Sequence, residues 1–178
     1  LNAGDIVSLD TACRLEGWCG DAAWTYAIGE VDDEKRRLMD IGEQALLAAI
    51  EGLKTDRLWS QVARRMMDVV HRAGFSIVEQ FVGHGIGREM HEPPQVPNFT
   101  NTQMAREDFE LQPGLVLAIE PMINAGSKDA KILSDGWTAV TTDNRPSVHF
   151  EHTVAITREG PLLLTQGVGD PAFPAPAA

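Results

Sequence analysis

Two pairs of acidic residues in this chain could bind a cation. Asp10 and Asp21 lie on either side of Glu16-Gly17, a dipeptide with good turn chemistry, so their carboxylates should face each other across a β-hairpin. Glu120 and Glu151 each stand within an apolar, strand-like stretch, where a charge is almost never buried without a partner. Few Lys or Arg are near either glutamate, which favours a divalent cation. The alternatives are solvated aspartates on an exposed hairpin and ordinary buried ion pairs for the glutamates.

Two histidines lie in one Gly- and Pro-rich segment. His84 stands in Gly83-His84-Gly85-Ile86-Gly87, and His91 follows seven residues later, before Glu92-Pro93-Pro94. Glycine beside His84 would permit close approach of backbone and ligand. A lone histidine is more often structural than a ligand, but two in one such segment favour a site. Two Asp, one His and two Glu suit hard or borderline divalent ions, and five ligands with bridging carboxylates fit two ions better than one.

The hydrophobic pattern predicts the elements that must position these residues. Alternation predicts hairpin arms over 5–12 and 18–28, with Gly20 available for a bulge that adjusts the register. Helical spacing predicts helices over 33–53 and 58–73. Strands are predicted over 75–82, 115–123, 137–142, 148–157 and 162–165, with 83–114 largely irregular. We therefore predict one α+β domain over residues 1–168 and a disordered tail over 169–178.

The composition argues against several classes of partner. Fifteen Lys and Arg against 26 Asp and Glu give a formal charge of −11, which disfavours nucleic acid and anionic membranes. No apolar run approaches the ~18 residues of a membrane span, and no signal-peptide pattern is present, so a cytoplasmic location is predicted. The two cysteines, Cys13 and Cys19, are too few for a disulfide framework and fit ordinary thiols.

Taken together, the motifs resemble the type 1 methionine aminopeptidases of the pita-bread metallopeptidase fold. The shared order is two Asp eleven positions apart, then Gly-His-Gly-Ile-Gly, Ile-Glu-Pro-Met and Phe-Glu-His-Thr, within residues 4–164. The resemblance implies an α+β fold in which helices cover the outer face of a curved antiparallel sheet. Only 30 residues separate Glu120 from Glu151, which leaves no room for the insertion of the type 2 enzymes.

The resemblance also implies a role for each candidate residue. The implied ligands of two divalent ions, with Co, Mn, Fe and Zn as candidates, are Asp10, Asp21, His84, Glu120 and Glu151. His91 would contact the substrate and stabilise the transition state, while Glu120 would take the proton of the attacking water. Met90 and Trp137 would line a pocket for the methionine side chain.

The implied activity is removal of the N-terminal methionine from nascent proteins by a monomer, with the ribosome as one candidate place of contact. An Xaa-Pro aminopeptidase-like exopeptidase and an inactive pita-bread binding module are the alternatives. The family has an upstream segment with another catalytic histidine and part of the methionine pocket, and this sequence starts after it. We therefore expect the chain alone to bind metal but to cleave slowly or not at all.

His149 stands where the family usually has Gln. On a strand it shares a face with Glu151, so it could be a sixth ligand, a group behind the ligands, or a plain replacement of the amide.

Overall fold

The fold begins with a long antiparallel hairpin. The computed structural model describes residues 1–106 and 108–169, so the predicted tail lies outside the described residues from 170 onwards. Strands β1 (Ile6–Leu15) and β2 (Trp18–Ala27) pair without interruption. Glu16 and Gly17 join them with φ of 51° and 80°, as a type I′ turn requires. The predicted turn is confirmed.

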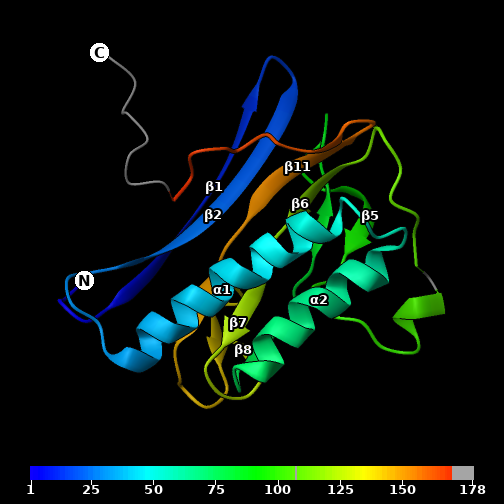
Figure 1. The fold of residues 1–178 in the computed structure, drawn as a ribbon. Helices are drawn as coiled ribbons and strands as arrows, with labels where there is room; N and C mark the ends of the chain where they lie inside the picture. The colour runs from blue at the N-terminus through cyan, green and yellow to red at the C-terminus, as the bar shows by residue number, and fades with distance from the viewer. Residues whose placement is uncertain (107, 170–178) are drawn as a thin grey trace.

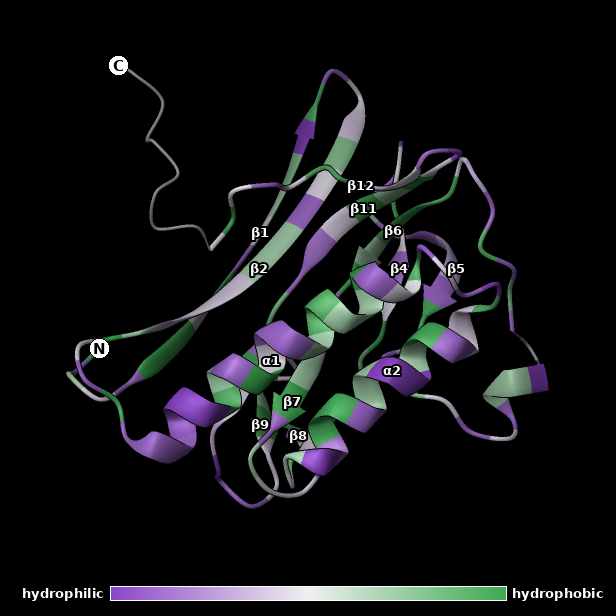
Figure 2. Ribbon diagram, viewed as in Figure 1, coloured by the Kyte–Doolittle hydropathy of each residue, from purple (hydrophilic) through white to green (hydrophobic). Residues whose placement is uncertain are grey.

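Two helices follow the hairpin, as predicted. Helix α1 (Asp33–Gly52) begins after Asp32, whose side chain accepts a 2.8 Å hydrogen bond from the Lys35 N–H. Helix α2 (Trp59–Arg72) ends just before Gly74, which has a φ of +79°. The helices lie side by side over one face of the sheets (Figure 1). Their hydrophobic residues alternate with hydrophilic ones around each helix (Figure 2), which leaves an apolar face for the core.

In the described part of the chain, the remaining strands form two larger sheets and a small hairpin. Their bounds are β3 (Ser76–Ile77), β4 (Gly83–Gly85), β5 (Glu92–Val96), β6 (Val116–Ile119), β7 (Met122–Asn124), β8 (Ala130–Ile132), β9 (Ala139–Thr141), β10 (Ser147–His149), β11 (His152–Thr157) and β12 (Gly160–Leu163). One sheet has the order β12-β11-β6-β4-β5, the other β10-β7-β3, and β8 pairs with β9. All these pairings are antiparallel, which agrees with the predicted α+β class.

Two of the predicted strands are broken at their glutamates. The stretch predicted over 115–123 divides into β6 and β7 at Glu120-Pro121, and the one over 148–157 divides into β10 and β11 at Phe150-Glu151. Strands β6 and β11 pair in the five-stranded sheet, whereas β7 and β10 pair in the three-stranded sheet. Both glutamates therefore lie where two neighbouring strands pass together from one sheet to the other.

The observed strands differ from the predicted ones in two places. The strand predicted over 75–82 is only β3, and β8 was not foreseen. The described residues of the segment 83–114 are largely irregular, as predicted, apart from the short strands β4 and β5. No bulge forms at Gly20, because Cys13 pairs with it in a continuous register. Strands β4, β5 and β8 are only 3, 5 and 3 residues long, too short for an apolar alternation to stand out, which is why the pattern did not reveal them.

The glycines around His84 serve strand packing. A Cβ on Gly83 would lie 2.3 Å from the Ala118 carbonyl oxygen, and one on Gly85 would lie 2.3 Å from the Pro93 oxygen. The missing side chains thus let the backbones of β5 and β6 close on β4. The sequence suggested close approach of backbone and ligand, whereas the structure shows close approach of neighbouring strands, which holds His84 within the sheet.

The core lies between the two helices and the sheets. Its fully buried side chains include Leu38, Leu46, Met66, Ile119 and Phe150. The Phe150 ring contacts α1 at Gly42, where a Cβ would lie 2.5 Å from the ring. Because Phe150 is the neighbour of Glu151, this packing anchors the backbone that carries the glutamate. No helix of the described residues has the length and apolar character needed to cross a membrane.

Candidate metal centre

Three side chains from distant parts of the chain come together beside strand β2 of the hairpin. Asp21 of β2, His84 of β4 and Glu151 between β10 and β11 each offer an atom within 4.8 Å of the others, and all three residues are buried. His84 Nδ1 lies 2.9 Å from the Gly85 carbonyl oxygen, which can only accept, so Nδ1 donates. The lone pair of His84 Nε2 then faces the carboxylates, as in a metal-binding imidazole.

Glu120 joins this cluster between two imidazoles. Its Oε1 lies 3.6 Å from His84 Nε2, and its Oε2 lies 3.6 Å from His149 Nε2. The Asn98 side-chain amide donates to the Glu120 backbone oxygen at 3.1 Å and holds the strand break in place. Glu120 thus reaches the centre from the junction of β6 and β7.

Asp10 lies at the rim of the cluster, with 58% of its side chain exposed. It pairs with Ala23, and Asp21 pairs with Ala12, so the two aspartates are nearly but not directly opposite each other. The offset is two residues, which keeps both side chains on one face of the hairpin, because side chains alternate along a strand. The charge of Asp10 still raises the pKa of Asp21.

Hydrogen bonds across the strands hold Asp21 and Glu151 together. The Asp21 N–H donates to Thr153 Oγ1 at 3.0 Å, and the Thr153 hydroxyl donates back to the Asp21 carbonyl oxygen at 2.7 Å. The Glu151 N–H donates to the Ala23 oxygen at 2.8 Å. Thr153 was not among the predicted site residues, although its place two residues after Glu151, on the same face of a strand, could have indicated it.

The electrostatics of the cluster favour binding of a cation. Burial, and then the charges of Glu120, Asp21 and Asp10, raise the pKa of Glu151 to about 9. Burial, followed by Asp10, likewise raises the pKa of Asp21. The buried oxygens Asp21 Oδ1 and Glu151 Oε1 have no hydrogen-bond partner among the described residues. Carboxylate oxygens and one or more imidazoles are suitable donors for divalent ions, so these residues fit a metal.

An open cleft of about 550 Å³ lies beside the cluster. Its lining includes Gln80, Phe81, His84, His91 and Glu120. The His91 ring centroid is 4.3 Å from that of His84, and His91 is exposed. The structure therefore places an imidazole donor at the edge of the cluster, where a ligand in the cleft could reach it.

The two predicted pocket residues lie elsewhere. Met90 is half-buried next to His91, and neither it nor Trp137 is among the described residues that line the cleft. Trp137 is 88% exposed in the β8–β9 connection, where its backbone N–H donates to Asp135 Oδ1 at 2.9 Å. The role of both residues in binding methionine remains a prediction.

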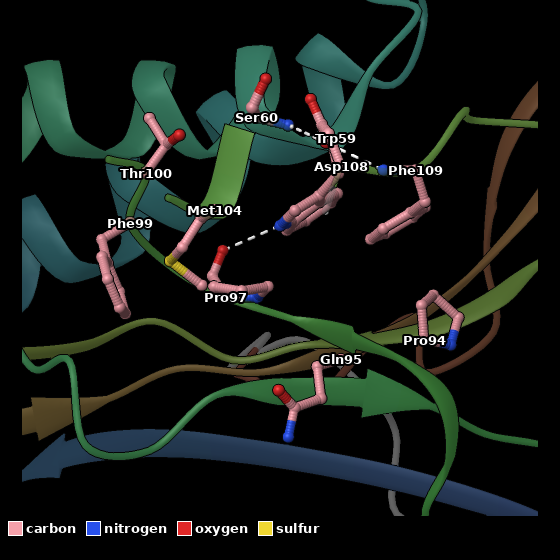
Figure 3. A pocket seen from close by; sticks show the side chains of 10 residues that line it. All are labelled: Trp59, Ser60, Pro94, Gln95, Pro97, Phe99, Thr100, Met104, Asp108 and Phe109. Carbon is pink, nitrogen blue, oxygen red and sulfur yellow. Dashed lines mark hydrogen bonds between the residues drawn. The ribbon is translucent and has the colours of Figure 1, made fainter. Parts of the chain in front are cut away.

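A second cavity, of about 290 Å³, contains none of the candidate ligands (Figure 3). It lies between the start of α2, strand β5 and the segment that follows β5. The Trp59 Nε1–H donates to the Pro97 oxygen at 2.8 Å, and the Trp59 and Phe109 rings stack with centroids 5.8 Å apart. These contacts attach Pro97 and Phe109 to the start of α2, and the described lining of the cavity has one carboxylate, Asp108, and no histidine.

Comparison with known proteins agrees with this arrangement. Residues 1–158 match metallopeptidase family M24. Over 93% of its length the chain is 41% identical to methionine aminopeptidase 1 of Bacillus subtilis and 44% identical to methionine aminopeptidase of Clostridium perfringens. It spans 66% and 65% of the length of these two relatives.

The fold matches as well as the sequence. The chain superposes on the crystal structure of methionine aminopeptidase from Thermotoga maritima with a TM-score of 0.85 and 40% identity. The superposition covers 91% of this chain and 64% of that one. The predicted resemblance and the pita-bread fold are confirmed.

Proposed function

The chain belongs to metallopeptidase family M24, and from this premise we propose that it removes the N-terminal methionine of polypeptides with two divalent metal ions. The observation that carries the proposal is the convergence of buried acidic groups with an imidazole. Within the described residues, oxygens of Asp21 and Glu151 in this cluster lack a hydrogen-bond partner. The names of the curated relatives support methionine as the residue released.

Five residues would hold the metal: Asp10, Asp21, His84, Glu120 and Glu151. Divalent ions bound there would supply Lewis acidity, which polarises the peptide carbonyl and lowers the pKa of a water. With Co, Mn, Fe and Zn as candidates, the single imidazole among five ligands suits a hard or borderline ion.

The chain's own residues would supply the remaining chemistry. The Glu120 carboxylate is placed to accept the proton of the attacking water, because it reaches into both the cluster and the cleft. His91 would donate a hydrogen bond to the oxyanion that develops on the scissile carbonyl. The free α-amino group of a peptide would bind at the loaded metal centre, which would select the N-terminus of the substrate.

We further propose nascent proteins as the substrates. We also propose that the protein acts in the cytoplasm as a monomer, with the ribosome as a place of contact. Met90 and Trp137 are proposed to contact the methionine side chain once a substrate is bound.

A peptide assay tests the activity directly. The protein, loaded with Mn or Co, is incubated with Met-Ala-Ser, Leu-Ala-Ser or Ala-Pro-Ala, and free amino acids are measured by mass spectrometry over hours so that slow turnover is detected. Release of methionine alone supports the proposal. Release of alanine from Ala-Pro-Ala would indicate an Xaa-Pro enzyme, and metal binding without any cleavage would indicate that this chain by itself is an inactive binding module.

Variants of the cluster make the test specific. Asp21→Asn and Glu120→Gln should each abolish methionine release, and calorimetry should show loss of at least one of two metal equivalents. Glu43→Gln, a change of the same kind on the exposed face of α1, is the matched control and should leave both unchanged. Two metal equivalents retained in Asp21→Asn would contradict the proposed centre.

A further inference from the structure

We propose that His149 is a direct nitrogen donor to the metal centre, so that the two ions share two imidazoles and not one. This inference rests on the metal centre proposed above and adds a sixth ligand to it. It concerns the last residue of β10, whose side chain is 16% exposed.

The first support is an unpaired buried nitrogen. His149 Nε2 has no hydrogen-bond partner among the described residues and is shielded from solvent. Leaving a buried polar atom unpaired costs about 1–3 kcal/mol, so such an atom in a folded site indicates a missing partner. The nitrogen lies beside Glu120, whose Oε2 is 3.6 Å away.

The second support is the spacing of the donor atoms. Two atoms that bind one ion at about 2.0–2.2 Å lie about 3–3.7 Å from each other at octahedral to trigonal angles. His149 Nε2 and Glu120 Oε2 are 3.6 Å apart, and His84 Nε2 and Glu120 Oε1 are also 3.6 Å apart. Each oxygen of Glu120 therefore has one imidazole nitrogen at the distance expected for a shared ion. On the other side of the ring, His149 Nδ1 lies 4.0 Å from Asp10 Oδ2.

The third support is the fixed backbone of His149. The His149 N–H donates to Thr25 Oγ1 at 3.0 Å, and the Thr25 hydroxyl donates to the His149 carbonyl oxygen at 2.8 Å. The bond to the His149 oxygen uses the only hydroxyl proton of Thr25. In the 2.8 Å hydrogen bond between Ser8 Oγ and Thr25 Oγ1, Ser8 is therefore the donor. We call the two hydrogen bonds between Thr25 and the His149 backbone the Thr25 clamp. Because Thr25 is 1% exposed, this clamp is buried and holds His149 against β2, the strand of Asp21.

A second imidazole would change which ions the centre prefers. Nitrogen donors suit borderline ions such as Co and Zn, whereas an all-oxygen set suits Mn and Mg. With one imidazole beside each oxygen of Glu120, the centre should favour Co over Mn more strongly than a site with a single histidine.

The experiment compares four proteins, each checked for its fold by circular dichroism: wild type, His149→Gln, His71→Gln and Asp21→Asn. His71 is an exposed histidine on α2 and serves as the matched control. Co and Mn binding are measured by calorimetry, Co coordination by visible absorption, and the number of imidazoles per Co by X-ray absorption.

The expected result is selective weakening of one metal equivalent in His149→Gln. Removing a group that only orients a ligand costs about 10- to 100-fold in metal affinity, so loss of a direct donor should cost at least about 100-fold. X-ray absorption with both sites saturated with Co should show one imidazole per ion on average in wild type and half as many in His149→Gln. The preference for Co over Mn should fall in the same variant.

The opposite results separate the two proposals. Unchanged Co affinity, absorption and imidazole count in His149→Gln, with metal lost in Asp21→Asn, would overturn the role of His149 and leave the metal centre intact. A modest loss of affinity with an unchanged imidazole count would also overturn it, because His149 would then act only through Glu120. Normal binding by Asp21→Asn would contradict the proposed function itself.

Discussion

Replacing Glu151 by Gln should stabilise the protein when metal is removed. Burial and the charges of Glu120, Asp21 and Asp10 raise the pKa of Glu151 from 4.5 to about 9. At pH 7 the carboxyl is therefore protonated in the folded state and ionised in the unfolded state. Glutamine keeps the shape of the side chain and cannot ionise.

The size of the effect follows from the pKa difference. An acid with a raised folded-state pKa binds more protons when folded, so the free energy of unfolding falls as the pH rises from about 4.5 to about 9. Between the ordinary pKa of 4.5 and pH 7, the free energy of unfolding falls over 2.5 pH units. At 1.36 kcal/mol per unit this amounts to about 3 kcal/mol, and at pH 5 to less than about 1 kcal/mol. Glu151→Gln should therefore have a free energy of unfolding that is higher than that of wild type by about this amount at each pH.

Urea unfolding with a chelator present, at pH 5 and at pH 7, measures the difference. The variant should exceed wild type by about 3 kcal/mol at pH 7 and by little at pH 5. Glu43→Gln on α1 is the matched control and should follow wild type at both values. With saturating Co the order should reverse, because the variant loses a ligand and with it the stabilisation by binding. Equal stabilities of Glu151→Gln and wild type at pH 7 would refute the argument that burial and the neighbouring carboxylates raise the pKa of Glu151 in the absence of a cation.

Three further changes test the framework of the site. Gly83→Ala should lower the free energy of unfolding by about 2 kcal/mol or more in urea, because its Cβ would lie 2.3 Å from the Ala118 oxygen; an unchanged midpoint would contradict the packing of β4. Thr25→Val should cost about 2–5 kcal/mol by the same measurement, since both backbone groups of His149 lose their partner, whereas Thr25→Ser should retain most of the stability. Asp32→Ala should cost about 1 kcal/mol in thermal unfolding through loss of the α1 cap, and a larger loss would show a role beyond capping.

The local elements of the fold could be predicted from the sequence because their signals are local. The Glu16-Gly17 turn, the cap at Asp32 and the apolar periodicity of both helices depend on residues only a few positions apart. The chemical nature of the site could also be predicted, since carboxylates in apolar strands need a partner wherever they lie. What the sequence determined alone was therefore which segments are helical, where the hairpin turns, and which residue types call for a cation.

Only the tertiary structure decided how these residues meet. Glu120 and Glu151 come together because two neighbouring strands leave one sheet and enter another at the same level, and no local pattern encodes that crossing. The two-residue offset between Asp10 and Asp21 and the shortness of β4 likewise depend on contacts with distant strands. His149 could be singled out from its sequence neighbours, but whether its nitrogen faces Glu120 depends on the Thr25 clamp from β2, over 100 residues away in the chain. Pairing between remote strands is chosen by the packing of the whole core, and for that reason it was decided only in the folded molecule.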